Sequence, residues 1–526
     1  QINTELIKPI KDIPFFLNTY GSTDSRYELN THFNKKISDK WSSSLFIHGN
    51  TRIAKYDMNN DGFLDNPLAK QINILNRWQY TNAQKGWVSF VNFRYMNDKK
   101  QTGQLGFVPN RDRLTTNFWG SEINTERVDV STKVGYVFPE MPFQSIGFQN
   151  AYNSHNQESY FGLNQYNIKQ KSYYSNLIFN SIIENTMNKF STGFNFAYDN
   201  YGEFVNLKDY SRTDNSIGTF FEYTYDNTSN FSVILGGRVD NHNRLGTFFT
   251  PRLHIRYNPW EKGVIRFSAG RGIRSANIFA ENQQLFGSSR TFEILNSNGK
   301  IYGLNPEIAW NYGLSFSQKF LLFNKNGDIG FDFYRTDFQN QVVVDLYQGP
   351  QKVLFYNLNG KSFANSLQFE FNYELAKHFN LRTAYKYYDI QTDYQYVTQE
   401  RPLQAKHRFF GNLEYQTHLL DDGKQWKFDF TINWLGKQRL PTTISNSAID
   451  SMPDYSPSFS VMNMQISRIF SSTFEIYVGG ENIGNYKQEK AILGSSNPFG
   501  SNFETSIIYA PIFGQMYYAG LRYKIK

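Results

Sequence analysis

The sequence predicts an all-β protein, folded as one closed antiparallel transmembrane β-barrel of about 22 strands. Three observations predict it: apolar and polar residues alternate over lengths that cross a bilayer, short polar turns recur, and longer loops separate them. The 526 residues include 48 Phe and 36 Tyr, and strong helix formers never gather into an amphipathic run. One large domain therefore fits better than the three or four that length alone suggests.

The predicted strands show two contrasting faces. In residues 426–434 every second residue is large and apolar and every residue between is polar, and residues 379–388 and 231–240 follow a similar pattern. A strand with lipid on one face and water on the other requires this alternation, because a charge on the lipid face at mid-depth would cost roughly 2 to 4 kcal/mol. We therefore expect the charged residues to face the barrel interior, among them Arg238, Asp240, Arg382 and Lys386.

Ten short polar segments mark hairpin turns, at residues 38–40, 82–85, 139–142, 184–186, 227–229, 260–263, 324–327, 376–378, 421–424 and 471–473. Two strands and a longer connection, such as 101–124 or 278–310, lie between successive turns. One further strand at each end gives about 22, an even number that closes a barrel. The asymmetry predicts short periplasmic turns and long extracellular loops.

Composition excludes several other classes. The longest apolar run is shorter than eighteen residues, which excludes a helical membrane span. The chain has no cysteine, and its net charge of +8 is scattered along the sequence, which argues against a nucleic-acid partner. We find no nucleophile elbow, no metal-binding histidine motif and no paired acids outside turns, so we expect no catalytic residue and no enzyme.

A calcium loop is the sharpest local motif. Oxygen ligands at Asp57, Asn59, Asp61 and Asp65, with the backbone carbonyl of Phe63, match the front of an EF-hand-type loop, and a glycine follows Asp61 for the sharp turn. The twelfth position is Leu instead of a bidentate Glu, so the ion would need another ligand. The alternative interpretation is a solvated loop rich in Asn, Asp and Gly. Apart from this calcium ion, we expect no cofactor.

Two further features have competing interpretations. Aromatic residues around Trp119, Tyr160, Phe161 and Phe499 either stack on a ligand in the extracellular loops or form a girdle at the membrane interface. Met462 and Met464 have a spacing that suits copper(I), but alternation places both on the lipid face with Ile466.

Several segments together resemble a known family. They are Thr250-Pro251-Arg252, residues 271–277, Asn305-Pro306-Glu307, Glu481-Asn482-Ile483-Gly484-Asn485 and the closing strand 517–526. The chain resembles, over nearly its whole length, the barrel portion of TonB-dependent outer-membrane receptors and transporters. That family has an N-terminal plug domain, whereas here only residues 1–6 resemble the last plug strand. We therefore assign residues 1–10 to the end of a plug domain and 11–526 to the barrel, and expect the rest of the plug to be missing from this chain.

The resemblance implies a multi-pass protein of the bacterial outer membrane that imports a scarce solute, such as a siderophore or other metal chelate, a vitamin or an oligosaccharide. It also implies as partners outer-membrane lipid, a plug domain, a TonB-type energy-coupling protein and a surface lipoprotein. The sequence assigns no substrate-binding residue. The alternatives are a passive porin-like channel, a structural barrel within a larger outer-membrane complex, and a soluble carbohydrate-binding protein.

Overall fold

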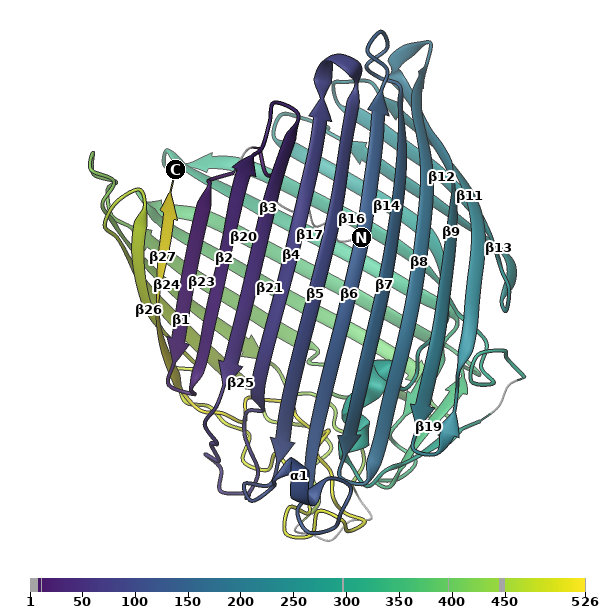
Figure 1. Cartoon of the computed structure of the whole chain (residues 1–526), viewed down its shortest axis with the longest axis vertical. Helices are drawn as coiled ribbons and strands as arrows, with labels where there is room; N and C mark the ends of the chain where they lie inside the picture. Colours follow the sequence, from purple (N-terminus) through teal and green to yellow (C-terminus); the bar gives the residue numbers. More distant parts are fainter. Residues whose placement is uncertain (1–7, 11, 296–297, 396, 444–449, 526) are drawn as a thin grey trace.

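A closed antiparallel barrel of 22 strands forms the body of the protein, as seen in a computed structural model that describes residues 8–10, 12–295, 298–395, 397–443 and 450–525 (Figure 1). The first strand, β1 (Phe15–Ser22), pairs with the last, β27 (Met516–Ile525), with Phe15 opposite Ile525. This pairing joins the two ends of the sheet, so the barrel has no free edge. The predicted fold class and strand number are confirmed.

The strands between these two follow one another around the wall in chain order. They are β2 (Arg26–Lys36), β3 (Trp41–Arg52), β4 (Leu68–Asn82), β5 (Trp87–Gly103), β6 (Gly120–Val137), β7 (Ser145–Phe161), β8 (Asn164–Ile183), β9 (Asn185–Val205), β11 (Arg212–Asp226), β12 (Phe231–His242), β13 (Gly246–Tyr257), β14 (Gly263–Arg274), β16 (Glu307–Leu322), β17 (Lys325–Asn340), β20 (Ser362–Ala376), β21 (Phe379–Asp393), β23 (His407–Gln416), β24 (Gln425–Leu435), β25 (Phe459–Ile469) and β26 (Phe474–Glu481).

The remaining elements lie in the connections. They are η1 (Ala83–Lys85), α1 (Pro109–Asp112), β10 (Lys208–Asp209), η2 (Ala280–Gly287), β15 (Thr291–Ile294), β18 (Val342–Asp345), β19 (Lys352–Asn357) and β22 (Thr398–Glu400). Within the described ranges, no helix is both long enough and apolar enough to cross a membrane.

All ten predicted hairpin turns lie at one end of the barrel, drawn uppermost in Figure 1 and called here the short-turn end. The turn between β16 and β17 consists of Phe323 and Asn324, with φ of +47° and +58°. Positive φ at both central residues is the two-residue hairpin geometry that matches the twist of the flanking strands.

The opposite end, called here the loop end, carries most of the long connections. Three of its connections are turns of two or three residues, at 23–25, 162–163 and 243–245. At 162–163 the wall itself is tall: the flanking strands β7 and β8 have 17 and 20 residues, against the roughly 9 to 11 that cross a bilayer. On this side of the barrel, strands rather than loops extend beyond the membrane.

The alternation predicted for the wall is confirmed by strand pairing. Trp426 and Phe428 of β24 lie on the outer face and are exposed, whereas Lys427 and Asp429 share the inner face. Met464 of β25 pairs with Phe430 and is 39% exposed on the outer face. The outer wall is therefore apolar and the inner wall polar, as a membrane barrel requires.

Candidate functional site

The largest buried core of this protein lies at the loop end, among loops that come from separate parts of the wall (Figure 1). We call these loops the loop cap; it consists of the described residues of 53–67, 104–119, 275–306, 341–361, 436–458 and 482–515. Phe63, Trp119, Phe286, Phe355 and Phe503 come from five of these loops and belong to one hydrophobic cluster. Buried apolar area therefore holds the loops together across the mouth of the barrel.

Aromatic contacts dominate this core. The ring of Phe279 lies 5.9 Å from Phe292, 5.6 Å from Tyr302 and 6.2 Å from Phe355, each in an edge arrangement. Beside them, β15, β19 and β18 form a separate three-stranded sheet, in which β15 runs parallel to β19. This small sheet joins the loop 275–306 to the loop 341–361 by backbone hydrogen bonds.

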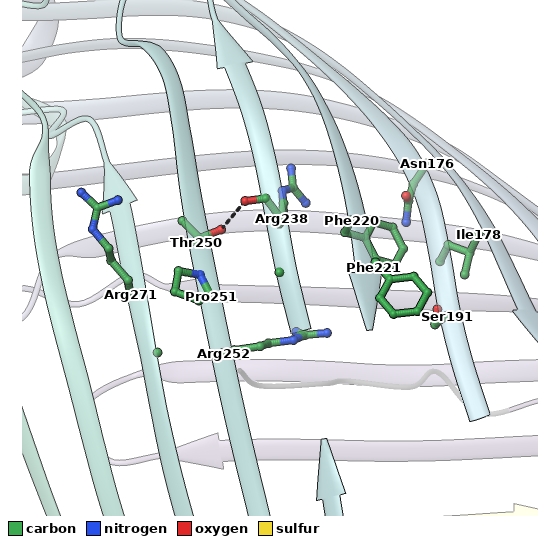
Figure 2. Close-up of a pocket in the computed structure, with 12 residues that line it drawn as sticks. Asn176, Ile178, Ser191, Phe220, Phe221, Arg238, Thr250, Pro251, Arg252 and Arg271 are labelled. Atoms are coloured by element: carbon green, nitrogen blue, oxygen red, sulfur yellow. Dashed lines mark hydrogen bonds between the residues drawn. The ribbon is translucent and has the colours of Figure 1, made fainter. Parts of the chain in front are cut away.

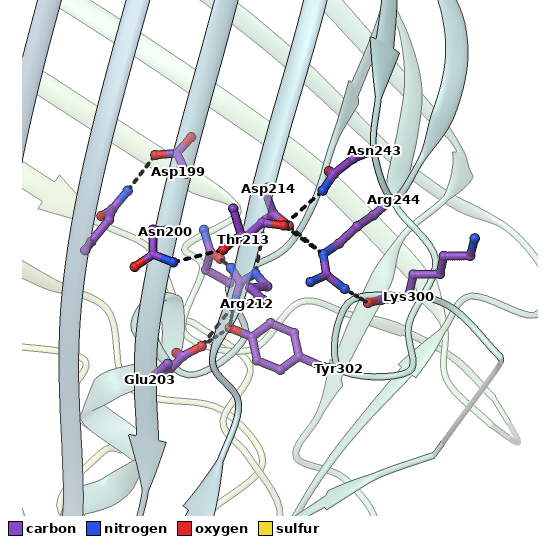
Figure 3. A network of polar contacts seen from close by, with 12 residues as sticks. Asp199, Asn200, Glu203, Arg212, Thr213, Asp214, Asn243, Arg244, Lys300 and Tyr302 are labelled. Carbon is purple, nitrogen blue, oxygen red and sulfur yellow. Dashed lines mark hydrogen bonds and ion pairs between the residues drawn. The ribbon is translucent and has the colours of Figure 1, made fainter.

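A buried ionic network attaches the loop 275–306 to the wall (Figure 3). The side chain of Arg212, on β11, is 5% exposed; its Nη1 lies 3.1 Å from Glu203 of β9, and its Nε lies 3.1 Å from Asp214. Arg212 also donates to the hydroxyl of Tyr302 at 2.9 Å and to the side chain of Asn277, both in the loop. Its guanidinium stacks 4.0 Å from the ring centre of Tyr201.

Glu203 is fully buried, and three donors satisfy its carboxylate. The hydroxyls of Tyr166 and Tyr302 and the guanidinium of Arg212 all donate to it. Burial, followed by the charge of Glu203, raises the pKa of Tyr302 well above its ordinary value, so this hydroxyl stays protonated and donates. Removing one member of such a network would leave a buried charge without its partner.

Two further ion pairs fix the loop 275–306, one to the wall and one to another loop of the cap. Arg244 reaches Asp214 at 2.9 Å and donates to the backbone carbonyl of Lys300 at 3.4 Å (Figure 3). Arg290 pairs with Glu504 at 2.5 Å, with side-chain exposures of 1% and 5%, and so links the loop 275–306 to the loop 482–515. Arg290 also donates to backbone carbonyls of the loop 341–361. The buried guanidinium of Arg290 therefore links three loops of the cap.

A cavity of about 440 Å³ lies on the wall, lined by residues of β8, β9 and β11 to β14 (Figure 2). Arg238, Thr250 and Arg252 line it, and the hydroxyl of Thr250 donates to the backbone carbonyl of Arg238 at 3.5 Å. Arg238 pairs with Asp240 at 2.6 Å, and Arg252 pairs with Glu222. These arginines are largely neutralised within the wall.

Three of the segments that carried the family resemblance, Thr250-Pro251-Arg252, residues 271–277 and Asn305-Pro306-Glu307, lie on or next to β13, β14 and β16, beside this cavity. Pro251 has no N–H to donate, and the pairing of β13 with β14 extends only from Tyr257 to Arg252. The guanidinium of Arg271 instead bridges the two strands by donating to the carbonyl of Phe249 at 2.9 Å. Further along β14, Arg274 binds Glu307 at 2.6 Å. Arg271 and Arg274 therefore connect neighbouring strands of the wall near the position where Pro251 interrupts the backbone hydrogen bonds.

The four charged residues predicted to face the interior do so. Arg238 pairs with Asp240, as described, and Arg382 lies 3.4 Å from Glu414. Lys386 lies 4.8 Å from the ring centre of Tyr388. Each of these charges has a neighbour on the wall, and cross-strand pairing places them on the face opposite the apolar residues.

The predicted calcium loop folds around its own carboxylates. Asp57 accepts hydrogen bonds from the backbone N–H of Asp61 at 3.1 Å and of Gly62 at 2.9 Å, and Asp61 accepts from Phe63 at 2.9 Å. Asp65 accepts from the backbone of residue 58 at 2.6 Å. Burial, then the charges of Asp57 and Asp61, raise the pKa of Asp65 to about 6.

These three carboxylates are thus close enough to repel one another, as oxygen ligands of one cation would be. The side chain of Asn59, also a predicted ligand, donates to Asp61 at 2.9 Å. Nevertheless, among the described residues no group of three or more His, Asp or Glu side chains is arranged to hold a metal ion. The calcium site stays a prediction.

The aromatic segments follow neither interpretation offered by the sequence. Trp119, Tyr160 and Phe161 are buried, with Trp119 only 6% exposed, and Trp119 and Phe161 belong to the hydrophobic cluster of the cap. Phe499 packs against the same cluster. They therefore act as core residues of the loop cap, which sequence alternation alone could not reveal because the cluster forms between distant loops.

Comparison with known families gives one match, to the family described as "TonB dependent receptor-like, beta-barrel", over residues 11–483. A search of curated proteins finds no match to the sequence.

Solved structures share the fold at low sequence identity. The siderophore receptor PirA from Acinetobacter baumannii matches with a TM-score of 0.72 and 14% identity, covering 97% of this chain and 80% of that one. The ferric enterobactin receptor PfeA from Pseudomonas aeruginosa, in complex with BCV-L6, gives 0.72 and 11%, covering 97% and 81%. FpvA from P. aeruginosa, bound to heterologous pyoverdines, gives 0.70 and 10%, covering 98% and 72%.

Proposed function

This chain belongs to the TonB-dependent receptor β-barrel family, and from that membership we propose that it is the barrel of an outer-membrane active transporter that imports a scarce solute. Barrels of this family lie in the outer membrane, and the family and its solved relatives are receptors rather than enzymes. The observation that carries the proposal is the loop cap, in which five loops around the mouth share one hydrophobic core. A passive pore would need an open mouth, whereas a receptor needs a surface that retains its ligand.

A siderophore-type metal chelate is the solute class that we propose. Two of the solved structures with the same fold are named as a siderophore receptor and a ferric enterobactin receptor, and a third is bound to pyoverdines. The inner wall adds a physical argument: Arg256 and Arg266 are direct cross-strand partners on the inner face of β13 and β14. No carboxylate pairs with either guanidinium in the described part of the chain. Opposed cations of this kind favour an anionic chelate or an acidic surface of an inner domain.

The partners that we propose follow from the family. A plug domain would occupy the polar interior, a TonB-type protein would supply the energy for its rearrangement, and a surface lipoprotein could cover the loop end. Residues 1–7, which include the segment resembling the last plug strand, lie outside the described residues. The polar inner wall supports a folded domain inside the barrel, because such a wall hydrogen-bonds readily to another polar surface.

We also propose a structural calcium ion in the loop 53–67, held by Asp57, Asn59, Asp61, Asp65 and the carbonyl of Phe63. The raised pKa of Asp65 supports it, because a divalent cation would relieve the repulsion among the three carboxylates. The ion would fix this loop next to the wall; it would take no part in moving the solute.

Uptake and conductance together test the transport proposal. Cells that produce the intact protein should accumulate a radiolabelled ferric siderophore, and a protonophore should abolish this accumulation. The same protein in a planar bilayer should be nearly closed. A steady large conductance, or uptake that persists after the protonophore, would instead identify a passive pore.

A further inference from the structure

We infer that Lys70 of β4 and Lys99 of β5 form a binding site on the outer wall for the phosphate group of an anionic membrane lipid. The two lysines are direct cross-strand partners and both are exposed. Residues in such a pair have Cβ atoms about 4.5 to 5.5 Å apart, and like charges placed there repel. The arrangement is therefore unfavourable unless an anion lies between the two ammonium groups.

Both side chains point away from the barrel interior. Alternation places Lys70 on the same face of β4 as Ile72 and Trp78, which are exposed on the outer wall. On β5, Lys99 shares its face with Phe93, also exposed, whereas Arg94 on the other face donates to Asn73 inside the barrel. Lipid, rather than a domain inside the barrel, is therefore the surrounding that the two lysines face.

No acidic side chain neutralises this pair. Within the part of the chain that the structure describes, neither ammonium forms an ion pair or a hydrogen bond, and the next partner of Lys99 is the neutral Asn124. The acids nearest by register on the same outer face are Glu122 and Glu126 of β6, which are diagonal neighbours of Lys99, and neither forms an ion pair with it within the described residues. By contrast, the neighbouring Lys100 faces the interior and binds Asp98 at 3.0 Å.

The depth of the pair matches a lipid headgroup. Trp87, at the short-turn end, is twelve residues before Lys99 on the same face of β5. At about 3.3 Å per residue and a strand tilt of about 40°, this separation spans about 30 Å along the membrane normal, which is the thickness of the hydrocarbon core. Trp87 thus lies at one interface, and Lys99 lies at the other, on the side of the loop cap.

A second strand repeats the pattern. On the outer face of β8, Ile183 at the short-turn end is followed twelve residues away by Lys171, and then by Lys169. Tyr173 precedes these lysines on the same face, as an interfacial aromatic would. Exposed lysines therefore follow the apolar outer surface at the same distance from the short-turn end on two strands, β5 and β8, which fits a lipid surface better than a single bound ion.

Lipid retention by the purified protein tests the site. Native mass spectrometry would compare dioleoyl phosphatidylglycerol, dioleoyl phosphatidylcholine and inorganic phosphate as probes. We expect the wild type to prefer phosphatidylglycerol and the double variant Lys70→Gln/Lys99→Gln to bind it at least fivefold more weakly. The matched control, Lys100→Gln, alters the next residue on the same strand and should bind like the wild type. Equal binding by the double variant and the wild type would overturn the proposal, as would full displacement of the lipid by phosphate.

A charge reversal separates binding from folding. Lys99→Glu replaces a repulsive cross-strand pair with an attractive one, so the variant should be at least as stable as the wild type in neutral detergent. It should nevertheless gain no thermal stability from phosphatidylglycerol, whereas the wild type should gain several degrees. A variant that is stabilised by this lipid as strongly as the wild type would overturn the proposal.

Discussion

The hydroxyl of Tyr302 accepts a hydrogen bond from Nη1 of Arg212 at 2.9 Å, although the two residues are 90 positions apart in the sequence. Arg212 belongs to β11 of the wall and Tyr302 to the loop 275–306 of the loop cap. Through this contact the mouth of the barrel is attached to the barrel itself, and Glu203 binds both residues. Any opening of the loop 275–306 has to separate these buried polar groups.

We expect Arg212→Met to loosen the loop cap. The substitution leaves the carboxylate of Glu203 buried without its cation, which typically costs about 3 to 5 kcal/mol. Hydrogen exchange in the loop 275–306 should accelerate by about a hundredfold or more. The control Arg382→Met removes an exposed ion pair on the inner wall and should leave this exchange unchanged. Unchanged exchange in the Arg212 variant would contradict the role of the network.

We expect Gly162→Val to displace Trp119 from the core of the cap. Gly162 has a φ of +58°, and a Cβ there would lie 2.4 Å from Nε1 of Trp119. Gly246 offers a matched control, because its φ is +75° but no atom lies within 4 Å of the added Cβ. Both valine variants carry backbone strain of about 1 to 2 kcal/mol, and only the first also disrupts packing. Proteolysis in the loop 104–119 should therefore increase in Gly162→Val alone, and equal cleavage of the two variants would refute the packing argument.

We expect Met464→Lys to destabilise the barrel much more than Gln465→Lys, although the two positions are adjacent. Met464 faces outward near the middle of β25, whereas Gln465 donates to Ser467 on the inner face. A lysine on the lipid face at mid-depth costs about 2 to 4 kcal/mol, and one on the inner face costs little. Denaturant unfolding of the barrel from lipid vesicles measures the free energy of unfolding of each variant. Similar stabilities would show that the outer face of β25 does not contact hydrocarbon.

Calcium binding by the loop 53–67 should weaken as the pH falls through about 6. The pKa of Asp65 is raised to about 6 from an ordinary value of 3.8, so its charged form is disfavoured in the folded loop. Without calcium, the loop accordingly loses stability as the pH rises from about 4 through about 6. Calcium requires the deprotonated carboxylate, so its affinity rises over the same window.

Calorimetry at pH 5 and pH 7 measures this dependence. Asp65→Asn should bind calcium more weakly and lose most of the difference between the two pH values, because the titrating group is gone. Equal calcium affinity of the wild type at both pH values, or no heat of binding at millimolar calcium, would eliminate the site.

The sequence by itself determined the barrel. Alternation in residues such as Trp426 to Trp434 fixes which face meets lipid, since the side-chain period of a strand is two, and the ten polar segments fix where strands reverse. Both signals are local, so they can be identified without coordinates. The family resemblance was also local, and the structure explains it by the contacts of Pro251, Arg271 and Arg274.

Only the tertiary structure decided what the loops do. Phe63, Trp119 and Phe503 are distant in sequence, and each occurs in a segment without regular alternation, yet they form one core. Arg290 and Glu504, which form a buried ion pair, are likewise far apart in the sequence. The physical reason is that burial in the cap depends on loops meeting across the mouth of a closed barrel. Such contacts follow from closure of the whole sheet and leave no periodic signal in any one segment.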